Sequence, residues 1–148
     1  MKKLLRIFIV AVVSTLFMTA CTDPGGSLNI EFKNASSYDI TLAEASPQYE
    51  NGEVITEIIE RYNIKVGESQ TVSAYQIGAV DWWTFWVYTR ISCIKFGDME
   101  MVYMGERYGN IENYELIKSN DNAKFYRYTF TDEDYQYALE NGQKVDQK

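Results

Sequence analysis

Side-chain chemistry in this chain has to proceed without histidine, which is absent from all 148 residues. Histidine is the commonest general base and metal ligand at neutral pH, and a Ser-His-Asp triad requires one. Cys21 and Cys93 lie far apart in the sequence with no histidine to complete a ligand set, which excludes the usual zinc sites. The oxygen-rich turns lack calcium-loop spacing. We therefore expect no metal, no cofactor and no catalytic residue, although a carboxylate pair placed by the fold stays open.

The densest group of side chains that could bind a ligand is aromatic. Its rings, all within one seven-residue stretch, are Trp82, Trp83, Phe85, Trp86 and Tyr88. We expect residues 83–89 to form a strand, with Trp82, Trp86 and Tyr88 on one face and Trp83 and Phe85 on the other. Exposed rings can stack on the flat apolar faces of sugars, so Trp82, Trp83, Trp86 and Tyr88 are the candidate ligand-binding residues. The alternative, which we favour, is that both faces are covered and the rings fill the core.

Alternating apolar and polar residues predict the short β-strands that must position these rings. The expected strands lie at 28–33, 38–43, 54–66, 70–77 and 83–89, followed by hairpins that pair 91–96 with 99–104 and 114–118 with 124–130. Residues 46–53, which include Pro47 and Asn51-Gly52, predict a loop. About eight short strands favour an all-β, antiparallel, immunoglobulin-like β-sandwich.

One short C-terminal helix is expected after this sandwich. Thr131 can cap it, and the acidic residues 132–134 suit the positive end of a helix dipole. Asn141-Gly142 can end it. Its buried face is expected to carry Tyr135, Ala138 and Leu139. The domain is then 28–142, followed by a frayed tail at 143–148.

Residues 1–20 have the layout of a secretory signal peptide: basic residues first, then an apolar run, then small residues before Cys21. The unbroken apolar run, residues 7–13, is shorter than the about 20 residues that span a bilayer. This length disfavours the alternative of a transmembrane anchor.

The segment Met18-Thr19-Ala20-Cys21 resembles the lipobox of bacterial lipoproteins, in which Leu and a small residue precede Ala or Gly and then Cys. Ala20 and Cys21 match this pattern, and Met18 replaces the usual Leu. The resemblance implies cleavage before Cys21, a diacylglyceryl group on its sulfur and a third acyl chain on its amine. Several acyl chains anchor a protein stably, whereas one binds reversibly. Residues 21–27 would form the lipidated tether.

The membrane that the exported protein reaches is inferred by comparison with other bacterial lipoproteins. Asp directly after the cysteine favours inner-membrane retention in enterobacterial lipoproteins, and Thr22 occupies that position here. The outer membrane is therefore expected, and the sequence does not assign the periplasmic or the surface face. The chain as a whole resembles the small, largely uncharacterised β-sandwich lipoproteins of Bacteroidetes, in its signal, its paired hairpins and its closing segment 128–135. This resemblance implies an envelope location and no particular activity.

Charge excludes one class of partner. Removal of the basic residues Lys2, Lys3 and Arg6 leaves 11 basic against 21 acidic residues, a net charge of −10. Such a surface repels phosphate backbones, so we expect no nucleic-acid partner. The leading hypothesis is a lipid-anchored envelope lipoprotein with a non-catalytic role, either protein-binding or structural. The alternatives are a glycan-binding accessory module that uses exposed tryptophans and, third, a small hydrolase. The expected partners are the membrane, through the anchor, and an envelope protein or glycan.

Overall fold

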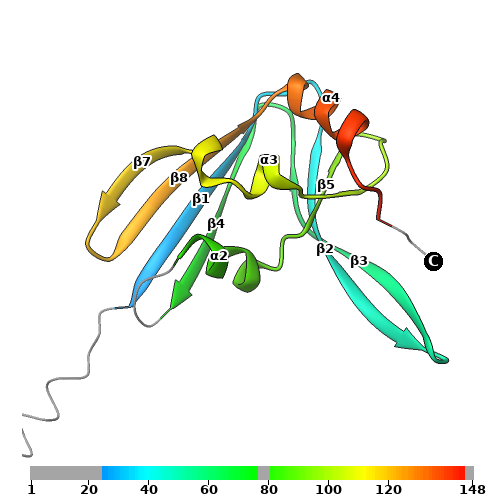
Figure 1. Ribbon diagram of the computed structural model, residues 1–148. Helices are drawn as coiled ribbons and strands as arrows, with labels where there is room; N and C mark the ends of the chain where they lie inside the picture. The colour runs from blue at the N-terminus through cyan, green and yellow to red at the C-terminus, as the bar shows by residue number, and fades with distance from the viewer. Residues whose placement is uncertain (1–24, 77–80, 146–148) are drawn as a thin grey trace, which may run out of the picture.

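A computed structural model describes residues 25–76 and 81–145 of the chain (Figure 1). The first sheet has the order β4-β1-β8-β7 and contains β1 (Gly26–Asn34), β4 (Ser69–Gln76), β7 (Glu115–Asn120) and β8 (Ala123–Phe130). The second has the order β3-β2-β5-β6 and contains β2 (Ile40–Glu50), β3 (Glu53–Ile64), β5 (Cys93–Phe96) and β6 (Val102–Tyr103). The helical segments are α2 (Trp82–Thr89), α3 (Glu106–Gly109), the 3₁₀ turn η1 (Ile111–Asn113) and α4 (Asp132–Asn141).

The predicted fold class is confirmed: the protein is an all-β sandwich with one short C-terminal helix, and strands make up 52% of the described residues. The strand pairs are antiparallel except at the centre of the first sheet, where β1 runs parallel to β8. Both predicted hairpins form, as β5–β6 and β7–β8. The expected signal peptide at 1–20 and the expected lipid site at Cys21 lie outside the described residues.

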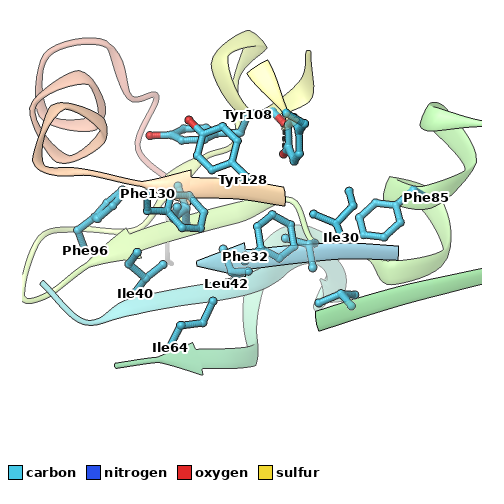
Figure 2. Packing of buried hydrophobic residues seen from close by; sticks show 14 of the residues in the cluster. Ile30, Phe32, Ile40, Leu42, Ile64, Phe85, Phe96, Tyr108, Tyr128 and Phe130 are labelled. Carbon is cyan, nitrogen blue, oxygen red and sulfur yellow. Dashed lines mark hydrogen bonds between the residues drawn. The ribbon is translucent and has the colours of Figure 1, made fainter. Parts of the chain in front are cut away.

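The core lies between the two sheets and is rich in aromatic rings (Figure 2). Phe32 of β1 stacks on Phe130 of β8 with ring centroids 5.9 Å apart, and Phe96 of β5 meets Phe130 edge-on at the same separation. All three side chains are fully buried. Burial of each such ring stabilises the fold by about 1.5–3 kcal/mol. The contact between Phe96 and Phe130 joins the two sheets directly.

A buried asparagine holds two turns together at one end of the sandwich. The Nδ2 of Asn34 donates to the carbonyls of Tyr38, at 2.8 Å, and Ile64, at 2.9 Å. Its Oδ1 accepts from the N–H of Ser36 at 3.0 Å and from the Ser36 hydroxyl at 2.8 Å. The side chain is fully buried, and it joins the β1–β2 turn to the end of β3. The sequence leaves residues 34–37 between the strands expected at 28–33 and 38–43, and it does not indicate this contact across the fold.

The loop predicted at 46–53 is wrong. β2 continues to Glu50 and β3 starts at Glu53, so only Asn51 and Gly52 form the turn. Both have positive φ, 52° and 86°, which matches the two-residue hairpin that an Asn-Gly pair favours. Pro47 is tolerated because β5 pairs with β2 only at residues 40–43, which leaves that side of β2 without a strand partner around Pro47.

The domain boundaries also extend beyond those predicted. Gly26 and Ser27, assigned to the tether, already belong to β1. Gln143–Val145, assigned to the frayed tail, pair with β6: the Tyr103 N–H donates to Gln143 and the Val145 N–H to Met101. Val145 is buried because it covers an apolar patch on the outer face of the second sheet, made of Ala43, Cys93 and Met101. Residues 146–148 lie outside the described part of the chain.

The predicted helix face needs one correction. α4 begins and ends as expected, but Leu139 is 52% exposed, while Asp134 and Ala138 are the buried residues and Tyr135 packs against the core. The sequence pattern assigned Asp134 only to the acidic first turn of the helix. The partners that hold Asp134 inside come from β8 and α3, and no local pattern indicates them.

We predict that Asn34→Ala lowers the free energy of unfolding by about 3 kcal/mol, because it leaves several buried polar groups without a partner. Asn34→Asp should be at least as damaging, since it keeps the acceptor but turns a carboxylate oxygen towards two carbonyls. Denaturant unfolding of the chain without residues 1–21 measures both. The control is Asn63→Ala in β3, which is exposed and should change stability by less than about 0.5 kcal/mol. Equal effects at positions 34 and 63 would contradict this role for Asn34.

Candidate functional site

The aromatic stretch forms a helix, not the predicted strand. In α2, the carboxylate of Asp81 caps the first turn by accepting from the Thr84 N–H at 2.7 Å. Arg90 ends the helix in the left-handed conformation, at φ 56°. The sequence does carry the helical signal, because Trp82, Phe85 and Trp86 follow a capping residue at a spacing of three and four. The density of aromatic residues favoured a strand and hid this signal.

The helix divides the candidate residues differently from the predicted strand. Phe85 is fully buried in the core, and Trp82 and Trp86 are partly buried beside it. Trp83 and Tyr88 point outward, with 75% and 59% of their surface exposed. The hypothesis that the rings merely fill the core is therefore wrong for two of the four candidates.

Trp82, Trp83 and Trp86 line one pocket on the surface of the protein. Its volume is about 380 Å³, and the remaining lining residues come from the β5–β6 region and from α3: Ile91, Ser92, Tyr103, Met104 and Gly109. Tyr88, the fourth candidate, is not among the lining residues. Sequence reasoning missed the residues from β6 and α3, because only the tertiary fold brings them beside α2.

The pocket is apolar, and two of its few polar groups are engaged within the protein. The indole N–H of Trp82 donates to the Gly109 carbonyl. The Ser92 hydroxyl accepts from the Ala45 N–H at 2.9 Å. The Nε1 of Trp86 is buried and has no hydrogen-bond partner among the described residues. No charged side chain is among the lining residues, so the pocket suits an apolar group better than a polar one.

Trp82 connects the pocket to the rest of the fold. Its ring meets Tyr114 edge-on at 4.6 Å, and its N–H holds α3 at Gly109. The Tyr114 hydroxyl in turn donates to the Tyr108 carbonyl at 2.6 Å. The wall of the pocket therefore depends on where α3 lies.

A buried carboxylate fixes α3. Asp134, which is 2% exposed, accepts on Oδ1 from Arg107 Nε and from the Tyr128 hydroxyl, both at 2.7 Å. Its Oδ2 accepts from the N–H of Thr131 at 2.8 Å and from its hydroxyl at 3.2 Å. The Tyr108 hydroxyl also donates to the Asp134 carbonyl, at 3.2 Å. This polar cluster joins α3, β8 and the start of α4.

The environment of this cluster shifts the pKa of several members. Burial, reinforced by the Asp134 charge, raises the pKa of Tyr108 and Tyr128 well above the ordinary tyrosine value. Burial also raises the pKa of Tyr114. For Arg107, burial alone would lower the pKa, but its hydrogen bond to Asp134 and the charge of that carboxylate raise it instead. Arg107 therefore stays charged and the tyrosines stay neutral at physiological pH.

Neither a reactive thiol nor a metal cluster is present among the residues that the structure describes. Cys93 is fully buried, and burial raises the pKa of its thiol, as expected of a small core residue rather than a nucleophile. Residues 25–76 and 81–145 contain no cluster of three or more Asp, Glu or Cys that could hold a metal ion. No helix in those ranges is long and apolar enough to cross a membrane.

The shifted tyrosines predict a loss of stability in alkali. The folded chain holds the protons of Tyr108, Tyr114 and Tyr128 to higher pH than the unfolded chain, so their contribution is complete below about pH 10 and is lost as the pH rises above it. The free energy of unfolding should fall by up to about 4 kcal/mol per pH unit, about 1.4 for each tyrosine. Denaturant unfolding between about pH 8 and about pH 11 measures the slope. Tyr114→Phe removes one of the three tyrosines, so the slope of the free energy of unfolding against pH should fall by about one third. A flat stability profile would contradict the shifts.

Comparison with known proteins adds no further guide, since no known family, curated protein or solved structure matches this chain. The function therefore has to be argued from the pocket, the buried cluster and the N-terminal sequence.

Proposed function

We propose that this protein is a lipid-anchored lipoprotein of the bacterial cell envelope that binds a partner protein without catalysis. The observation that carries the binding role is the pocket beside α2, formed by Trp82, Trp83 and Trp86 and by neighbours from β6 and α3. An apolar pocket with an exposed tryptophan at its edge suits a large apolar side chain of another protein, the kind of anchor residue that dominates protein interfaces. The lipobox at residues 18–21 supports the anchor.

The hydrogen bonds that the Asp134 carboxylate already accepts support a non-catalytic role for this residue. A general base needs a free lone pair that faces a substrate, and this carboxylate already accepts four hydrogen bonds. Arg107 is engaged as well, by Asp134 and by the ring of Tyr137, whose centroid lies 5.0 Å from its guanidinium. These are the contacts of a structural cluster. A buried polar group that has all its partners rigidifies the fold around it.

A sugar is the less suitable occupant of the pocket. Sugar hydroxyls need carboxylates or amides around a stacking ring, and none lines this pocket. Asp81, the nearest acidic residue in sequence, caps α2, and Arg90 pairs with Glu44 at 3.7 Å. The glycan-binding hypothesis keeps the exposed ring of Trp83 as its support, and it ranks second.

Substitutions of the two cysteines test the proposed lipid anchor. Cys21→Ala should move the protein out of the membrane fraction and abolish labelling by an alkyne fatty acid, because the only predicted acyl acceptor is gone. Cys93→Ala is the matched control: it removes a buried thiol and should leave both location and labelling unchanged. Labelling that persists in Cys21→Ala would contradict the proposal.

The pocket is tested by photo-crosslinking in cells. A photoreactive phenylalanine at position 103, which lines the pocket, should yield one protease-sensitive adduct of defined mass. The same probe at position 49, on the β2–β3 hairpin and 82% exposed, should not. Met104→Glu places a charge in the pocket and should lower the adduct yield by about tenfold, equivalent to about 1.4 kcal/mol. Identical patterns at the two positions, or an adduct that resists protease and contains glycan, would contradict a protein partner at this site.

A further inference from the structure

The proposed anchor would hold one particular end of the sandwich near the bilayer. β1 begins at Gly26, and residues 22–25 are all that separates it from Cys21. A fully extended chain spans at most about 3.5 Å per residue, so Gly26 could lie no further than about 18 Å from Cys21. Gly26 pairs with Gln76 at the end of β4, and α2 packs on β4. Figure 1 shows the start of β1, the end of β4 and α2 at one end of the molecule and α4 at the other.

This end carries a group of exposed apolar side chains. Trp83, Val87 and Tyr88 project from α2 with 75%, 56% and 59% of their surface exposed. Tyr75, which is 72% exposed, lies on β4 opposite Ser27, near the start of β1. Single exposed apolar residues are ordinary, but four of them beside the origin of the tether need a reason.

From this placement, and resting on the proposed lipidation of Cys21, we propose that Tyr75, Trp83, Val87 and Tyr88 form a membrane-docking surface that lies in the headgroup region of the bilayer. Trp and Tyr concentrate at membrane interfaces because each has an apolar ring and a polar N–H or O–H. Such a surface is too small to bind a membrane alone. The anchor supplies the missing affinity, because a short tether makes the contact effectively intramolecular.

The contact is apolar rather than electrostatic. The expected mature chain has a net charge of −10, which disfavours attraction to anionic lipid. The charged residues that flank α2 are Asp81, which caps the helix, and Arg90, which pairs with Glu44. Docking therefore needs no anionic headgroup.

This orientation of the sandwich on the bilayer restricts which proteins can reach the pocket. Trp83 belongs both to the docking surface and to the wall of the pocket, so the pocket opens beside the bilayer. A protein that inserts a side chain there has to lie at the membrane surface itself, as an integral or lipid-anchored protein does.

The test uses the full-length mature protein, purified from its native membrane and mixed with phosphatidylcholine vesicles whose lipid carries brominated acyl chains, which quench nearby tryptophans. Emission should fall about twofold relative to unbrominated vesicles. Trp83→Phe should remove most of this quenching. Trp86→Phe is the matched control, because this ring is partly buried and its N–H has no hydrogen-bond partner within residues 25–76 and 81–145. It should retain the quenching.

The outcomes separate the two proposals. Protein that floats with the vesicles but shows no bromine-dependent quenching, or equal loss of quenching in both variants, overturns the docking surface and leaves the anchor intact. Protein that does not float with the vesicles overturns the anchor and, with it, the docking surface.

Discussion

The buried carboxylate of Asp134 is the contact on which the arrangement of the candidate site depends. It holds Arg107 and Tyr128 at 2.7 Å and the backbone of Thr131 at 2.8 Å, so that α3, β8 and α4 share one polar centre. An isolated charge in this position would be strongly destabilising, and the paired arrangement therefore permits few alternatives. α3 then presents the Gly109 carbonyl to Trp82 and fixes one wall of the pocket. Asp134 is thus linked, through α3, to the position of the Trp82 side chain.

The two sheets of the sandwich are held together mainly by buried apolar side chains. Alternating apolar residues in β1, β2 and β8 bury one face of each sheet, and the rings of Phe32, Phe96 and Phe130 join the two layers. Asn34 then locks the turns at one end through four hydrogen bonds. The other end carries α2 and the start of β1 (Figure 1). Hydrogen-bonded turns lie at one end and exposed aromatic residues at the other. This arrangement agrees with the proposed lipid anchor near the start of β1.

The sequence predicted the fold class well and the candidate site only in part. Most strands and two hairpins were recoverable because a period of two acts locally, whereas the β2–β3 hairpin was predicted as a loop. α2 was missed because aromatic density outweighed the helical spacing that begins after Asp81. Trp82, Trp83 and Trp86 were nevertheless identified by residue type, and they share one pocket. Tyr103, Met104 and Asp134 were beyond reach, since their roles depend on contacts between elements that are far apart in the sequence.

We propose that acyl chains on Cys21 tie this sandwich to a bilayer. Mass spectrometry of the N-terminal peptide, released from protein purified out of its native membrane, tests this proposal. We expect a peptide that starts at Cys21 and carries a diacylglyceryl group and an amide-linked acyl chain. A peptide that starts elsewhere, or an unmodified Cys21, would contradict it.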